Sequence, residues 1–198
     1  PVCAVFREHL SGRELRLWRD ELVALSHAPF QTSRDALFVA YYASAEFGCF
    51  LALGWPLPEA ALDLYVEHRA ESNGLPNGNG NGLLGALSWH GLDSMAGDGK
   101  DAMRQLVLRG GPWTAQERAA ILDYCARDVD ALARLLPRML PAILTRGDTP
   151  AQGLGQALLR GRYMAAVARM EHLGVPPDSA LLRDLRSSWG DLIEEIIR

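Results

Sequence analysis

Apolar and polar positions near the start of the chain follow the periods of strands rather than helices. Residues 2–7 and 14–18 are short apolar-rich segments on either side of Ser11-Gly12-Arg13, which predicts a β-hairpin with a glycine turn. Residues 20–25 predict a turn of helix. Residues 36–42 form a continuous apolar run of strand length, which is typical of a strand buried on both faces.

The middle of the chain changes to alternating strand and helix. A helix is predicted over 45–53, with Ser44 as its N-cap and Gly54 at its end. Residues 61–67 predict a short strand that turns into a helix, with Asp63 at the junction. Residues 72–82 are rich in Asn and Gly and predict a mobile surface loop without regular structure.

The clearest helix signal covers residues 114–140. Thr114 and Glu117 have the spacing of a capping box, and Pro137 and Pro141 are expected to end the helix. Shorter helices are predicted over 83–89 and 100–108. Apolar residues recur at helical spacing along one side of the long helix, so this side should lie against the core. The residues of this apolar stripe are Ile121, Leu122, Cys125, Val129, Leu132, Leu135 and Leu136.

This order of elements predicts an α/β fold in which a mixed sheet is flanked by helices. Residues 1–144 would form the main domain and residues 145–156 a polar linker. Residues 157–198 would add a C-terminal helical extension, with helices over 158–173 and from 178 or 179 to the end. Two helices are too few for an independent core, so this extension should pack on the main domain or belong to something larger.

Composition limits the function classes. The 198 residues carry a net charge of −4, so nucleic-acid binding would depend on local basic clusters such as Lys100, Arg104 and Arg109. The same spacing also suits an ordinary solvated face. Three separated cysteines suit a reducing cytoplasm and are interpreted as core residues, and neither a membrane span nor a signal peptide is recognisable.

Candidate chemistry comes from three side chains. Tyr124 and Asp128 are four residues apart, so they project from one face of the long helix, and Glu46 lies in the first turn of the helix after the apolar strand. Clustered carboxylates hold divalent metal ions that promote phosphodiester hydrolysis. Alternatively, Tyr124 covers the core edge, Asp128 is a solvated charge and Glu46 only stabilises the start of its helix.

Two motifs resemble the proofreading 3′–5′ exonuclease domain of family A DNA polymerases, particularly the phage-type enzymes. Tyr124-Cys125-Ala126-Arg127-Asp128 is similar to the third motif of that family, Tyr-x-x-x-Asp. Residues 36–54 are similar to the second motif, with Glu46 at the position of a metal-binding Asp. Residues 159–175 resemble the start of the polymerase thumb, so the resemblance covers nearly the whole chain.

The resemblance implies a ribonuclease H-like exonuclease fold with a two-metal site for Mg²⁺ or Mn²⁺. Glu46 and Asp128 would bind metal, Tyr124 would position the attacking water, and the substrate would be the 3′ end of single-stranded DNA. The first motif of the family, Asp-x-Glu, does not occur in residues 1–18. We therefore expect the chain by itself to be impaired, and its partners to include the remainder of a polymerase or a completing polypeptide. An inactive scaffold that binds DNA or a protein is the alternative.

Overall fold

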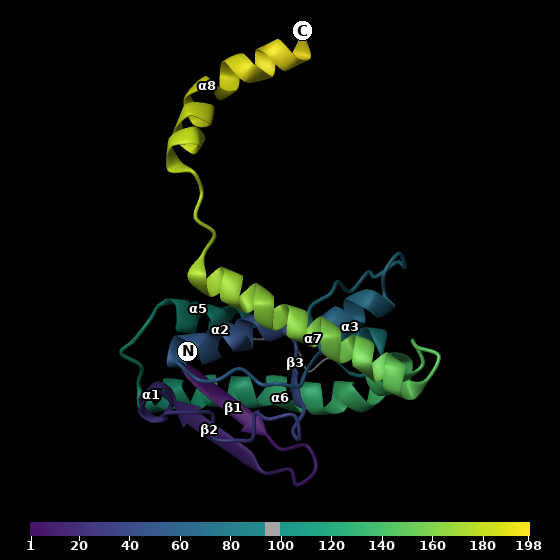
Figure 1. Cartoon of the computed structure of the whole chain (residues 1–198). Helices are drawn as coiled ribbons and strands as arrows, with labels where there is room; N and C mark the ends of the chain where they lie inside the picture. Colours follow the sequence, from purple (N-terminus) through teal and green to yellow (C-terminus); the bar gives the residue numbers. More distant parts are fainter. Residues whose placement is uncertain (94–99) are drawn as a thin grey trace.

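The computed structural model describes residues 1–93 and 100–198, and in this part of the chain helices surround two small sheets (Figure 1). Strands β1 (Cys3–Arg7) and β2 (Glu14–Trp18) form one sheet. Strands β3 (Phe38–Ala40) and β4 (Ala61–Asp63) form the other. The α/β class is therefore confirmed, although the expected single mixed sheet is divided into two pairs of strands.

The predicted hairpin is present. Strands β1 and β2 are antiparallel, with Cys3 opposite Trp18 and Arg7 opposite Glu14, and Gly12 takes the positive φ of 71° that the turn requires. Helix α1 (Arg19–Ala24) follows and buries Leu22. The hairpin and the second sheet share an aromatic core cluster that contains Phe30, Phe50 and Trp55.

Strands β3 and β4 are parallel, and each leads directly into a helix. Helix α2 (Ala43–Leu53) follows β3, and helix α3 (Leu64–Glu71) follows β4. The strand predicted over 36–42 is shorter because Tyr42 has a left-handed φ of 72° and begins the helix. Ser44 is not the N-cap, which was a wrong prediction: it is buried inside the first turn of α2.

Helix α6 (Ala115–Leu144) begins at the predicted capping box, but it continues past both prolines. The prediction that Pro137 and Pro141 end the helix was wrong. Each proline removes one backbone hydrogen bond, yet Met139 and Ile143 are fully buried in the main core, so tertiary packing holds the last turns. Two short helices, α4 (Leu83–Trp89) and α5 (Lys100–Leu108), precede α6 as predicted.

Helix α7 (Pro150–Leu173) starts earlier than predicted, within the expected linker, because Thr149 and Gln152 form a capping box. One face of α7 lies against β4 and α2 through small residues. A Cβ on Gly161 would come within 2.0 Å of the carbonyl oxygen of Ala61, so only glycine permits this approach. Helix α8 (Ser179–Ile197) begins after the N-cap Asp178 and extends away from the rest of the molecule (Figure 1).

None of the helices in residues 1–93 and 100–198 is long and apolar enough to cross a bilayer.

Candidate functional site

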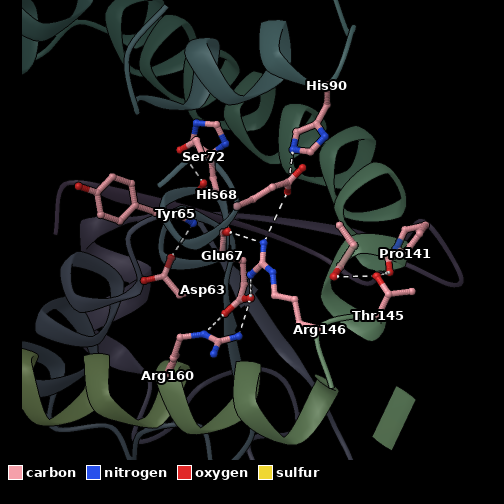
Figure 2. Close-up of polar contacts among 12 residues, drawn as sticks. Asp63, Tyr65, Glu67, His68, Ser72, His90, Pro141, Thr145, Arg146 and Arg160 are labelled. Atoms are coloured by element: carbon pink, nitrogen blue, oxygen red, sulfur yellow. Dashed lines mark hydrogen bonds and ion pairs between the residues drawn. The ribbon is translucent and has the colours of Figure 1, made fainter. Parts of the chain in front are cut away.

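Asp63 fixes the starts of both helices that follow the parallel strands. Its Oδ1 accepts hydrogen bonds from the backbone N–H groups of Tyr42 and Tyr65, each at 2.9 Å, and its Oδ2 accepts one from the N–H of Ala43, also at 2.9 Å. Figure 2 shows its contact with Tyr65. Burial raises the pKa of Asp63, and these backbone donors oppose that shift. A side chain at the end of β4 thus caps α2 as well as α3, which is why α2 needs no cap of its own.

Glu46 lies in the first turn of α2 and is mostly buried. Its Oε2 is enclosed by protein and has no hydrogen-bond partner within the described structure. Burial raises the pKa of Glu46 to about 7, a backbone hydrogen bond opposes this shift, and the nearby Asp63 and Cys125 raise the pKa further. A buried carboxyl oxygen without a donor is costly, and it suits a ligand that brings positive charge.

Tyr124, Cys125 and Asp128 lie on neighbouring turns of α6. The charge of Cys125 raises the pKa of Glu46, and the charge of Asp128, three residues along the same helix, raises the pKa of Cys125. Partial burial raises the pKa of Tyr124, and the charge of Asp128 adds to this. The Arg127 guanidinium lies 5.6 Å from the centre of the Tyr124 ring. Asp128 itself is exposed.

The β-hairpin holds this part of α6 in position. The neighbouring Cys3 thiol on β1 lowers the pKa of Cys125. Arg16 on β2 forms an ion pair with Asp123 at 2.6 Å, and Arg7 on β1 forms one with Asp130. Acids on either side of the predicted motif are therefore paired with hairpin arginines.

The described residues do not form a complete metal centre. Among the described residues, no three side chains of His, Cys, Asp or Glu lie close enough together to hold a metal ion. Carboxylate oxygens are the ligands that Mg²⁺ and Mn²⁺ prefer, and the unpartnered oxygen of Glu46 fits such an ion. The residues present can therefore provide part of a metal site.

The three basic residues predicted to contact a phosphate backbone are not alike. The side chain of Lys100 is outside the described part of the chain. Arg104 is exposed on α5. Arg109 donates a hydrogen bond at 3.0 Å to Glu117, the capping-box residue of α6, so part of its charge is already neutralised.

A further buried carboxylate was not predicted from the sequence. Glu67 in α3 is fully buried, and Arg160 of α7 binds it through two hydrogen bonds, of 2.6 and 2.9 Å (Figure 2). Arg146, at the corner between α6 and α7, donates a further bond of 2.7 Å. The two arginines are about 80 and 90 residues away from Glu67 in sequence. No local sequence pattern could therefore have revealed this cluster.

Comparison of the chain with protein-family models, with curated proteins and with solved structures finds no match. The interpretation of the site therefore depends on the motifs and on the geometry described above.

Proposed function

We propose that the chain is part of a proofreading 3′–5′ DNA exonuclease with a ribonuclease H-like fold, associated with a family A DNA polymerase. The observation that carries the proposal is the buried, unpartnered oxygen of Glu46 beside Cys125, which also interacts with Asp128. In this proposal Glu46 and Asp128 hold Mg²⁺ or Mn²⁺. A divalent ion held by these residues would supply an activated water nucleophile and charge stabilisation for the leaving oxygen.

Tyr124 acts on the attacking water. Its raised pKa keeps the phenol protonated at neutral pH, so Tyr124 orients the water by hydrogen bonding instead of removing its proton. The partly protonated Glu46 loses its proton when a cation binds, because metal ligands must be deprotonated. The 3′ end of single-stranded DNA is the substrate, and nucleoside monophosphates are the products.

Two carboxylates are too few for two metal ions, so further ligands have to come from a segment or polypeptide outside these residues. Strands β1 and β3 each have a single strand neighbour, on one edge, within the described structure. Both strands contribute to the same aromatic cluster, through Phe6 and Phe38. A strand carrying Asp-x-Glu that pairs with either edge would bring its carboxylates close to this region.

The test is cleavage of a 3′-labelled single strand with Mg²⁺ or Mn²⁺ by the chain, by Asp128→Ala and by Asp123→Ala. Asp123 lies on the same helix and pairs with Arg16, so its replacement controls for the loss of a helix charge. Cleavage that falls at least tenfold in Asp128→Ala and stays similar in Asp123→Ala supports the exonuclease. Equal, negligible rates in all three proteins contradict activity of this chain.

The alternative is a catalytically inactive scaffold that binds DNA or a protein partner. The lack of a three-ligand cluster among the described residues favours it. Salt-dependent retention of a single-stranded oligonucleotide, weakened in Arg104→Ala but similar in the exposed hairpin variant Arg13→Ala, would support DNA binding through α5. Absent or salt-insensitive retention would indicate a protein partner instead.

A further inference from the structure

Helix α7 has apolar residues on two opposite faces. Met164, Ala168 and their neighbours are buried against the body of the molecule. On the far side, an exposed stripe recurs at alternating spacings of four and three residues. We call it the α7 stripe; it consists of Leu159, Tyr163, Ala166, Met170 and Leu173. Such a pattern is the seam of a two-helix coiled coil, and an exposed stripe of this kind indicates a binding surface.

Helix α8 carries the same pattern and buries no residue in the described structure. Its seam, the α8 stripe, consists of Leu182, Leu185, Trp189, Leu192 and Ile196. Because α8 is amphipathic and lies away from the rest of the molecule (Figure 1), its apolar side has no cover there. The two stripes have equal length.

We propose that α8 folds back on α7 as an antiparallel two-helix coiled coil, so that each stripe covers the other. Each step forward along the α7 stripe then matches the same step backward along the α8 stripe. The layers are Leu173 with Leu182, Met170 with Leu185, Ala166 with Trp189, Tyr163 with Leu192, and Leu159 with Ile196. The smallest residue of one stripe meets the largest residue of the other, as close packing requires.

Charges beside the seam agree with this register. In an antiparallel pair, residues on the same flank of the seam face each other. Arg162 of α7 then faces Glu195 of α8. These two charges are of opposite sign, which favours this register. A shallow hollow beside Leu159, lined also by Arg162 and Tyr163, is positioned to receive Ile196.

The connection between the helices is long enough. Residues 174–178 join Leu173 to the N-cap Asp178, and an extended five-residue segment with two prolines reaches about 15 Å. Adjacent helix axes are about 9 Å apart, and Asp178 would lie about 6 Å beyond the level of Leu182. Gly174 has the positive φ of 76° that commonly ends a helix before a reversal. The occupant of the α7 stripe is thus α8 of the same chain.

Oxidative crosslinking of the full chain tests the proposal. In Arg162→Cys/Glu195→Cys, mild oxidation of a dilute sample should give a disulfide within one chain, identified by peptide mass spectrometry. The control, Arg162→Cys/Glu194→Cys, places the second thiol at nearly the same level but on the side of α8 that faces away, and its yield should be at least tenfold lower. Circular dichroism checks that both variants remain helical.

A third variant adds Ala166→Glu to Arg162→Cys/Glu195→Cys. Ala166 is exposed, so the body of the protein tolerates the change, but the charged side chain blocks the layer with Trp189 and should lower the yield several-fold. Equal yields in the first two variants, no effect of Ala166→Glu, or disulfides formed mainly between two chains would each overturn the proposal. The last result would assign the α7 stripe to a second copy.

Discussion

Glu46 and Glu67 occupy equivalent places and have opposite surroundings. Each is the fourth residue of the helix that follows one of the two parallel strands. Glu67 is enclosed and receives hydrogen bonds from two arginines. Glu46 is also mostly buried, yet its Oε2 has no partner in the described structure and its pKa is raised to about 7.

The difference separates a structural carboxylate from a candidate functional one. A buried ion pair needs good geometry and further hydrogen bonds to offset desolvation, and Glu67 has both. A buried acid without a cation lowers stability, so Glu46 is a candidate for a role other than folding. Both residues follow a strand that leads into a helix. Glu67, after β4, forms an ion pair that joins α3 to α7, whereas Glu46, after β3, is a candidate metal ligand.

The largest expected effect is in Glu67→Gln. The amide keeps the shape of the side chain but leaves Arg160 without its negative partner, and it leaves Arg146 with only Glu71, 3.8 Å away. The free energy of unfolding should fall by about 3 kcal/mol. The reason is that the arginine charges stay partly buried, and the carboxylate no longer offsets the cost of removing them from water. Urea denaturation at pH 7 measures this. An unchanged midpoint would show that the two arginines find other partners.

Glu46→Gln should raise the free energy of unfolding at high pH, whereas Glu67→Gln should lower it. The pKa of Glu46 is raised from 4.5 to about 7 in the folded state, so the wild-type free energy of unfolding should fall as the pH rises from 4.5 to 7. At pH 8 the variant should be the more stable protein by up to about 3 kcal/mol, and at pH 4 the difference should vanish. Denaturation curves of both proteins across this range test it.

Repeating the denaturation experiment with Mg²⁺ or Mn²⁺ tests whether Glu46 binds a cation. If Glu46 binds a cation, adding the ion should stabilise the wild type above pH 7 and leave Glu46→Gln unchanged. In the pH experiment without metal, a difference in the free energy of unfolding between wild type and Glu46→Gln that does not change with pH would mean that Glu46 is not the buried acid described above.

A smaller effect is expected where α7 meets β4, since this contact brings Arg160 to Glu67. In Gly161→Ala the new methyl group would lie 2.0 Å from the carbonyl oxygen of Ala61, so α7 must shift. We expect a loss of about 2 kcal/mol from overpacking. Gly155→Ala on the same helix meets no atom within 4 Å, and it should be neutral or stabilising by up to about 1 kcal/mol. Thermal unfolding of both variants checks the contrast.

Local signals in the sequence predicted most of the elements. The hairpin, the strand that ends at Asp63, the start of α6 at Thr114 and the start of α8 at Asp178 were all predicted because each is marked by its own turn or cap residues. Predictions failed where distant residues decide the outcome. Pro137 and Pro141 lie inside α6 because packing overrides their local effect, and α2 begins before Ser44 because its cap comes from Asp63.

The candidate site was predictable in part for the same reason. The spacing of Tyr124 and Asp128 on one helix is a local property, and the proximity of both to Cys125 follows from it. The approach of Glu46 to Cys125 depends on how α2 sits relative to α6, which no periodicity reports. The nuclease chemistry and the metal ions stay predictions.

The single carboxylate of Asp63 accepts hydrogen bonds from the first N–H groups of two helices, α2 and α3. Because one carboxylate accepts hydrogen bonds from the starts of both helices, a shift of α3 would change the bonds that fix the start of α2. A disturbance that reaches Glu67 through α7 is therefore expected to affect the first turn of α2, which carries Glu46.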